Sequence, residues 1–400
     1  MLSPYLRVLR IPHVGALFLF GLLGSLPLGM AGLGLLLNTE ARTGSIAAAG
    51  LVSAAFGLGN AAGIAVQGRL MDRLGHSRVL LPASIVSGLA LGAAAFLSWQ
   101  PVLLSAAALA GLFYPATISS VRVLSTSLIT DADTRIAAYA LLAVSFGLVM
   151  VAGPLLVSGI VALTSPPAAV MTAAAIISIA GIGFAETPAV RRYQALEKPR
   201  RTSRRRLTPG LLTLLVASTC LGFAAGAKAV SLPAAAISQG LPALAGIGFA
   251  AMSIGDLIGG LGYGAIRWRA TRPRQLTVSL LLTVLVAAFA VPASRTVIVL
   301  FPVLLASGVL GACVPICMSA LLDDVVPPAS LTSAYTAMIS LSLVASAAGN
   351  ASAGALVQRG SPAAGFALAA SAALLALVWT ALRRSRWHLP QPPRAQNTRS

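Results

Sequence analysis

Long apolar runs with almost no charge follow one another along nearly the whole chain, and they decide what it can fold into. Only 9% of the residues are charged and the mean hydropathy is +0.89, whereas a soluble domain carries about 25% charged residues. Such a chain cannot cover its surface with polar groups, so lipid must be its main solvent. A helix of about 20 apolar residues crosses a hydrocarbon core. Twelve such helices are predicted, at roughly 12–37, 44–68, 79–98, 101–124, 136–161, 166–186, 210–232, 242–264, 275–293, 296–322, 331–357 and 363–382.

These runs predict helices and not a membrane barrel, because barrel strands are segments of about ten residues with alternating polarity. The expected fold class is therefore an all-α polytopic membrane protein. Arg7 and Arg10 precede the first apolar run, as the charged residues of a signal peptide do. We favour a retained first span over a cleaved signal, because it keeps the number of helices even.

The net charge of +19 is distributed in a way that predicts orientation and argues against a nucleic-acid partner. Of the 28 Lys and Arg residues, Lys228 lies within a span, and only Arg42, Arg295 and Arg359 lie in loops on one side. The remainder lie on the other side, which is the excess that marks cytoplasmic loops. Both termini are therefore expected in the cytoplasm, and the basic run Arg200–Arg206 is expected to bind anionic lipid. The preference for Arg over Lys and the abundance of Ala are typical of GC-rich bacteria, so the cytoplasmic membrane is the expected location.

The chain also contains an internal repeat. An offset of 196 residues aligns Ala49–Gly68 with Ala245–Gly264, and the same offset aligns Ser165-Pro166 with Ser361-Pro362. One offset that fits separated regions without a gap predicts two parallel six-helix halves. The expected domains are 1–187 and 210–385, joined by a basic cytoplasmic linker at 188–209 and followed by a cytoplasmic tail at 386–400.

Two similar bundles that face each other leave a cavity near the membrane midplane, and rocking of the bundles exposes it to each side in turn. Small residues let helices approach closely in lipid. The second, fifth, eighth and eleventh spans are richest in such residues, so we predict that they form the contact between the halves. The glycines concerned are Gly59, Gly63, Gly147, Gly153, Gly159, Gly255, Gly259, Gly260, Gly264, Gly349 and Gly354.

The stretch GRLMDRLGHSR lies in the predicted cytoplasmic turn between the second and third spans. It resembles the loop signature of the major facilitator superfamily, Gly-x-Leu-(small)-Asp-Arg-x-Gly-(basic)-(basic)-Arg, with His76 and Ser77 at the two basic positions. The resemblance implies a conformational latch, in which the Asp meets the start of the eleventh helix near Pro327–Ser333 and the Arg residues brace the halves in the outward-facing state. A helix N-terminus favours a carboxylate; an ordinary anchoring loop is the alternative. The residues of this latch are Gly68, Asp72, Arg73, Gly75 and Arg78.

A second, partial resemblance lies in the fifth span. Gly153-Pro154 is similar to the glycine–proline motif that kinks this helix at the interface between halves in proton-coupled exporters of the same family. A proline removes one backbone hydrogen bond and bends a helix whatever the direction of transport, so a kink without exporter meaning is the alternative. The resemblance covers the chain to about residue 385 and implies a twelve-helix, proton-coupled drug or metabolite exporter.

Ionisable side chains within spans are expensive, at about 2.5–3.5 kcal/mol on insertion scales, and they usually face a cavity or a partner. Asp256 is the candidate for carrying a coupling proton, with a structural carboxylate as the alternative. Lys228 is the candidate contact for substrate or ion, with a snorkelling side chain as the alternative. A direct salt bridge between them would need tilt or snorkelling, because they differ in depth by about 10 Å or more.

Three further residues are candidates of the same kind. Arg122, at the inner end of the fourth span, is a proton-coupling candidate because the family resemblance implies an Arg in that helix; an anchoring role is the alternative. Asn60 and Asn350 are candidate ligand contacts in interface helices, for which interhelical hydrogen bonding is the favoured role.

The sequence supplies no catalytic or metal-ligating cluster, so no enzyme activity, metal or cofactor is expected. No phosphate-binding loop is present either, and a proton gradient is the expected source of energy. We expect a monomeric secondary active transporter that exports a small, rather apolar molecule. A proton-coupled importer of a metabolite and a non-transporting membrane sensor are the alternatives. The histidines and cysteines behind this conclusion are His13, His76 and His388 at membrane edges, and Cys220, Cys313 and Cys317, which are assigned to packing.

Overall fold

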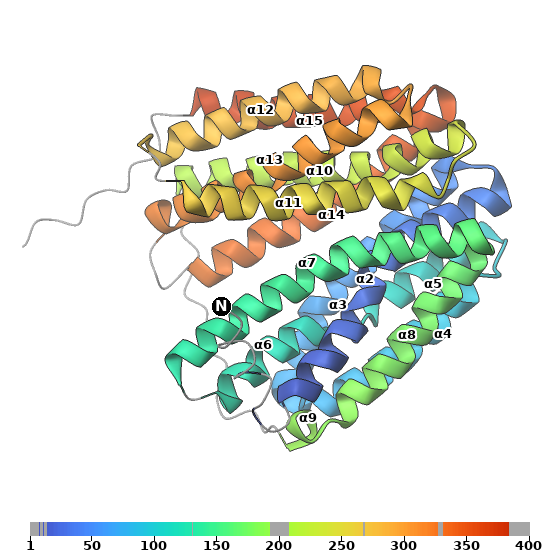
Figure 1. Ribbon diagram of the computed structural model, residues 1–400, viewed down its shortest axis with the longest axis vertical. Coiled ribbons are helices and arrows are strands. Elements are labelled where there is room, and N and C mark those ends of the chain that lie inside the picture. The colour runs from blue at the N-terminus through green and yellow to red at the C-terminus, as the bar shows by residue number, and fades with distance from the viewer. Residues whose placement is uncertain are drawn as a thin grey trace, which may run out of the picture.

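A computed structural model describes Val8, Ile11 and residues 14–129, 131–192, 208–266, 269–326 and 331–383. The predicted tail, most of the predicted linker and Pro327–Ser330 lie outside the described residues. The regular structure described is helical throughout (Figure 1). The helices are α2 (Val14–Thr43), α3 (Ile46–Leu74), α4 (His76–Ala94), α5 (Gln100–Leu112), α6 (Thr117–Leu128), α7 (Ala132–Leu163), α8 (Pro166–Glu186), α9 (Pro188–Arg192), α10 (Pro209–Ser238), α11 (Leu244–Ala265), α12 (Arg272–Ala293), α13 (Val297–Val325), α14 (Leu331–Arg359) and α15 (Pro362–Leu382).

Twelve described segments are long and apolar enough to cross a membrane, as predicted, but the fourth is not one continuous helix. It consists of α5 and α6, which are separated at residues 113–116 because Pro115 has no backbone N–H to donate. Gln67 of α3 compensates for the break. Its side-chain amide donates to the carbonyl oxygens of Leu112 (3.0 Å) and Tyr114 (2.9 Å), and its Oε1 accepts from Ala116 N (3.2 Å). A polar side chain in a span thus satisfies backbone groups that the break leaves without helical partners.

The helices form two bundles, α2–α8 and α10–α15, which lie side by side in Figure 1. The main contacts between them pair α3 with α14 and α7 with α11. These are the second, eleventh, fifth and eighth spans, so the prediction of which helices join the halves is confirmed.

The two pairings are related by the repeat. A Cβ placed on Gly50 of α3 would lie 2.7 Å from the Asn350 carbonyl oxygen of α14, and a Cβ on Gly246 of α11 would collide with the Pro154 carbonyl oxygen of α7. Gly50 and Gly246 are 196 residues apart, and so are Pro154 and Asn350. Each crossing therefore places a glycine of one half against a backbone carbonyl of the other, and only glycine leaves room for that approach.

Most of the other glycines of these spans contact helices of their own half. Gly59 and Gly63 pack against α5, Gly255 and Gly259 pack against α13, and Gly349 packs against α10. Most of the glycines that marked these spans therefore pack within one half, whereas Gly354 of α14 packs against Ile46 and Ala47 of α3 in the other half. Small residues permit close packing with any neighbour. Their number therefore identifies the helices that pack closely, but it does not identify which helix each small residue contacts.

The buried apolar residues show how the halves separate along their length. One cluster contains residues of both halves and lies toward the α2–α3 and α10–α11 loops; it includes Met30, Ala49, Ala227, Ala245 and Ala353. Toward the opposite end, each half has a cluster of its own. We call the first end the closed end and the opposite end, where the α3–α4 turn lies, the open end. The open-end cluster of the first half includes Leu17, Phe18, Leu80, Leu124 and Phe184, and that of the second half includes Leu214, Leu280, Met318, Leu322 and Met338.

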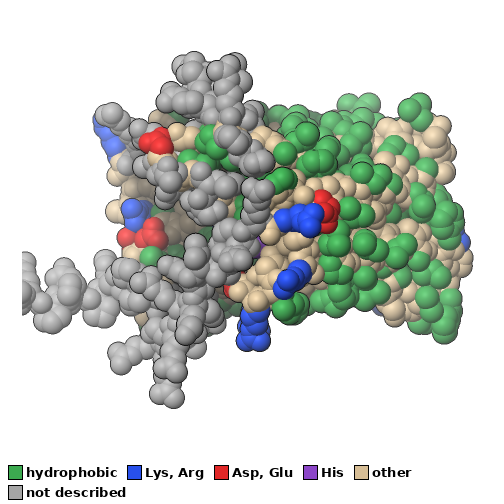
Figure 2. All heavy atoms as spheres, turned by 90° about the horizontal axis from the view of Figure 1, so that it is seen from below, with side chains coloured by type: hydrophobic (Ala, Val, Ile, Leu, Met, Phe, Trp, Pro, Cys, Tyr) green, Lys and Arg blue, Asp and Glu red, His purple; other side chains and the backbone are tan. Residues whose placement is uncertain are grey.

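The outer face of the first half is largely apolar. Figure 2 shows hydrophobic side chains over much of this face and charged side chains gathered mainly toward one end. Leu89 and Ile179 are 69% and 71% exposed in the isolated chain. Side chains of this kind suit contact with lipid tails, as the apolar sequence predicts.

Candidate functional site

The second half contains a cavity of about 350 Å³ between α10, α13 and α14, with Thr283 of α12 at its edge. Its wall is mostly apolar, through residues such as Leu221, Val314 and Met338. Ligand pockets of this size are typically apolar with a few placed polar groups. The polar side chains here are Ser218, Lys228, Thr283, Ser307, Ser319, Tyr335 and Ser342.

Lys228 is the one cationic side chain in the wall of this cavity. Its Nζ donates a hydrogen bond to Ser307 Oγ at 2.9 Å. The two ion pairs within 4.0 Å that are described join Arg191 to Glu186 and Arg272 to Asp324, so Lys228 has no carboxylate at that range in the described part of the chain. An ammonium group has three donors and no acceptor, and one neutral hydroxyl leaves both its charge and most of its donors uncompensated.

Asp256 approaches the same turn of α13 from the opposite side. It lies on α11, and a Cβ placed on Gly311 would be 2.7 Å from its Oδ1. Gly311 lines the cavity together with Ser307, one turn earlier on α13. The charges of Asp256 and Lys228 attract each other across this turn, although they form no ion pair within 4.0 Å. The structure thus brings two predicted site residues to one place, as near neighbours and not as a direct salt bridge.

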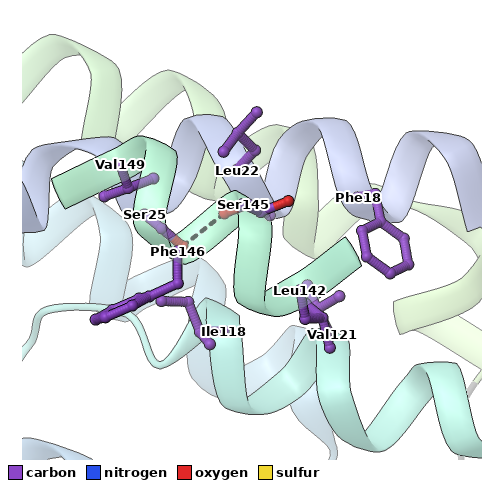
Figure 3. Close-up of a pocket in the computed structure, with 10 residues that line it drawn as sticks. Phe18, Leu22, Ser25, Ile118, Val121, Leu142, Ser145, Phe146 and Val149 are labelled. Atoms are coloured by element: carbon purple, nitrogen blue, oxygen red, sulfur yellow. Dashed lines mark hydrogen bonds between the residues drawn. The ribbon is translucent and has the colours of Figure 1, made fainter. Parts of the chain in front are cut away.

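The equivalent position in the first half holds a much smaller space, of about 20 Å³ between α2, α6 and α7. Figure 3 shows Phe146 of α7 lying beside Ile118 of α6 in this pocket. The 196-residue offset relates Phe146 to Ser342 and Gly32 to Lys228. The second half thus has a serine where the first has an aromatic ring and an amino group where the first has a glycine, and its cavity is the larger of the two and contains a cation.

At the closed end, polar groups of one half bond to the backbone of the other. Gln358 of α14 accepts from the Ile46 N–H at 2.7 Å, and so satisfies one of the unpaired donors at the start of α3. Ser158 Oγ of α7 accepts from the Gly246 N–H of α11 at 2.9 Å. These bonds join the halves where the buried cluster is shared.

A third bond of this kind follows from Pro154. Because proline has no N–H, the carbonyl of Met150, four residues earlier, lacks its helical partner. Ser253 Oγ of α11 donates to that oxygen at 3.0 Å. Although α7 continues through Pro154 without interruption, the carbonyl that the proline leaves unpaired is bonded by the other half. The sequence motif therefore acts at the interface through Met150 and Ser253 as well as through the proline itself.

The predicted latch residues lie at the open end, on a polar groove of about 530 Å³ lined by Asp72, Arg73, Gly75, His76 and Arg78 together with residues of α8 and α9. Gly75 ends α3 and has φ +88°, a conformation that glycine adopts without strain. The Asp72 carboxylate has no hydrogen bond or ion pair in the part of the chain described, and its charge acts on His76. Asp72 is predicted to meet the start of the eleventh helix, and Pro327–Ser330 of that segment lie outside the described residues.

Gly68, also assigned to the latch, has no heavy atom within 4 Å of the position that a Cβ would take. In this conformation its lack of a side chain is therefore not needed for packing.

The remaining candidates lie elsewhere. Arg122 is on α6 in the first half, with its side chain exposed. Asn60 lies where α3 packs on α5, and Asn350 lies on α14 at the crossing with α3. The side-chain oxygens of both asparagines are buried without a hydrogen-bond partner among the described residues, so the interhelical bonds predicted for them are not formed by these atoms.

Sequence reasoning missed Ser253, Ser307, Ser342 and Gln358. A usable signal existed for Ser253 alone, because Pro154 requires some donor for the Met150 carbonyl. Serine is common in spans, however, and a pattern along one helix does not identify the helix that supplies its partner.

Known proteins resemble this chain in family and in fold. A family model described as Major Facilitator Superfamily matches residues 15–349. No curated protein sequence matches the chain significantly.

Solved structures of similar fold cover almost the whole chain. A bacterial homologue of the iron transporter ferroportin in an inward-facing state has 16% identity and a TM-score of 0.77, covering 94% of this chain and 100% of that one. The nucleoside transporter NupG has 16% identity and a TM-score of 0.72, with coverage of 94% and 100%. A bacterial homologue of the human lysosomal transporter Spinster, described as inward-facing and occupied, has 12% identity and a TM-score of 0.69, with coverage of 94% and 95%.

Proposed function

The chain belongs to the major facilitator superfamily, and from that membership we propose that it exports a small, rather apolar molecule across the cytoplasmic membrane by alternating access driven by a proton gradient. Family and fold make it a multi-pass membrane transporter, and not an enzyme. The similar structures are named for nucleoside, iron and lysosomal transport, and one fold serves many cargoes. Substrate and direction must therefore be argued from this chain's own residues.

The observation that carries the alternating-access proposal is the split of the buried core. The halves share one apolar cluster at the closed end and have separate clusters at the open end. Two bundles joined in this way can rock about their crossings, so that the shared cluster parts while the open end closes. The excess of Lys and Arg assigns the open end to the cytoplasm, which makes this conformation inward-facing. The same excess supports contacts with anionic lipid, and we propose that one chain suffices for transport.

Proton coupling is assigned to Asp256. An acid within a span is a functional-site hypothesis by default, and proton relays are one of its uses; the carboxylate of Asp256 has no hydrogen-bond partner in the described structure. Its neighbour Gly311 lines the cavity, so a change in its charge would be felt where a substrate binds. Export is supported by Gly153-Pro154, which resembles the exporter motif and whose proline lies at the contact between halves.

The test is substrate-driven proton flux in proteoliposomes that hold a pH-sensitive dye, with a panel of apolar compounds. We expect wild-type protein to move protons opposite to the compound, and Asp256→Asn to lose the proton flux while still exchanging labelled for unlabelled compound. Asp324→Asn is the matched control, because it removes the carboxylate of an exposed ion pair with Arg272.

Three outcomes would contradict the proposal in different ways. Proton flux that persists in Asp256→Asn would refute the role of that residue. Protons and compound moving in the same direction would favour the importer. No exchange of any compound by wild-type protein would contradict transport of small apolar molecules.

A further inference from the structure

We propose that the cavity in the second half is a binding site for an amphipathic monoanion, whose negative group pairs with Lys228 and whose apolar body lies along α13 and α14. This inference rests on the proposed transport function and names its class of substrate.

The charge of Lys228 is the first argument. The amino group lies within a span and lines the cavity, and its described partner is the neutral hydroxyl of Ser307. Asp256 is near enough to attract it but does not pair with it within 4.0 Å. A cation in such surroundings gains more from an anion that enters the cavity than it would at a surface, because little water competes for it.

The asymmetry of the repeat is the second and independent argument. The related space in the first half has Phe146 in its wall and holds about 20 Å³, whereas the cavity with Ser342 at that position holds about 350 Å³. A void that served only packing would be filled equally well in both halves, since interiors leave few voids larger than a water molecule. The second half thus contains both the larger space, which could hold the body of a ligand, and the cation that could bind its charged group.

The wall of the cavity specifies the rest of the ligand. Apolar side chains such as Leu221, Val314 and Met338 face hydroxyl groups of Ser218 and Ser319 that are few and separate. One cation does not offset the desolvation of a di- or trianion, so a single negative group is specified. The site therefore fits a molecule such as an aromatic or aliphatic carboxylate.

The test is equilibrium binding to the purified full-length protein in detergent, with no gradient present. Benzoate, 2-naphthoate and octanoate are compared with their neutral amides by titration calorimetry. We expect at least one carboxylate to bind about tenfold or more tightly than its amide, which is the effect of one charged hydrogen bond. Equal affinities within every pair would overturn the proposal.

Variants place the effect in the cavity. Lys228→Met should weaken the carboxylate by about tenfold to a hundredfold and leave the amide unchanged, and Lys228→Arg should restore part of the loss. Arg295→Met, which removes a cation from an exposed loop, is the matched control and should change nothing. Ser342→Phe copies the first-half residue Phe146 into the cavity and should abolish binding of 2-naphthoate.

The outcomes separate this inference from the proposed function. The melting temperature shows whether the Lys228→Met variant is folded. If the folded variant binds the carboxylate as tightly as wild-type protein does, the inference is overturned, even if transport of neutral compounds is observed. Lys228-dependent binding without any exchange in proteoliposomes would support the site and contradict the transport proposal. Charge-selective binding that survives Ser342→Phe would place the anion outside the cavity and so overturn the inference.

Discussion

The hydrogen bond between Ser253 and the Met150 carbonyl offers a direct way to shift the conformational equilibrium. It joins the two halves toward the closed end, at 3.0 Å, and it exists because Pro154 leaves that carbonyl without a helical partner. Rocking to the other conformation parts α7 from α11 and must break it. Ser253→Ala should therefore destabilise the present conformation and leave the alternative one unchanged.

The size of the effect follows from the value of one such bond. Hydrogen bonds between membrane helices average about 0.6 kcal/mol, and typical intramolecular bonds reach about 1.5 kcal/mol. This corresponds to a change of about threefold to tenfold in the ratio of the two populations. Pro154→Ala should reduce the effect, because an alanine at this position would supply the missing N–H and Met150 would no longer need Ser253.

The assay is pulsed electron–electron distance measurement between spin labels on Thr164 and Ser238, which lie at the closed end of α7 and α10. Ser253→Ala should increase the long-distance population, and the increase should be smaller in the Pro154→Ala background. Ser105→Ala is the matched control, because its hydroxyl bonds to Pro101 within its own helix. An effect of equal size in both backgrounds, or one no larger than that of the control, would refute the reasoning.

Three further predictions follow from other contacts. Gly59→Ala should destabilise the protein by about 1–3 kcal/mol, because its Cβ would collide with the Ala108 carbonyl oxygen of α5. Gly57 has open space around the position of a Cβ, so Gly57→Ala should not lower the melting temperature in thermal unfolding. Asp72→Asn should slow transport but leave the melting temperature unchanged, since its carboxylate is unpaired in the described part of this conformation; a lowered melting temperature would argue against a latch that forms only in the other state. Arg42→Met should lower the melting temperature, because its guanidinium bonds the Ala95 and Phe96 carbonyl oxygens at the end of α4; an unchanged value would show that water replaces these bonds.

Much of the fold could be predicted because in lipid every backbone group must be paired within a segment. Apolar length therefore implies helices, and the 196-residue offset implies two equivalent bundles. The break between α5 and α6 was not predicted. Pro115 marks it in the sequence, but the break depends on Gln67 of another helix to satisfy the exposed backbone groups. A proline alone does not break a helix, because Pro27 lies inside continuous α2 and Pro154 lies inside continuous α7.

The candidate site was predictable only in part. Asp256 and Lys228 stand out because charge is rare in spans, and no pattern was needed to find them. Ser307, which bonds Lys228, is one hydroxyl among many, and its role depends on how α10 packs against α13. The cavity itself has Ser342 in its wall where the related space of the first half has the ring of Phe146. A sequence shows that substitution only after the two halves have been aligned, and it does not show that the space is left unfilled.

The cluster shared by the halves has a consequence for how easily they part. Nearly all the buried residues that the second half contributes to it are alanines, among them Ala224, Ala227, Ala236, Ala245 and Ala353, whereas its larger side chains there are only partly buried. Hydrophobic attraction scales with the apolar area that is hidden from water, at about 25 cal/mol per Å², and alanine hides little. Contacts between methyl groups are therefore close but bury little apolar area, so the halves can separate there at a small cost in free energy. Alternating access requires this separation in every transport cycle. Leucine at any of these alanines would bury more apolar area between the halves, which should make the protein more rigid and its transport slower.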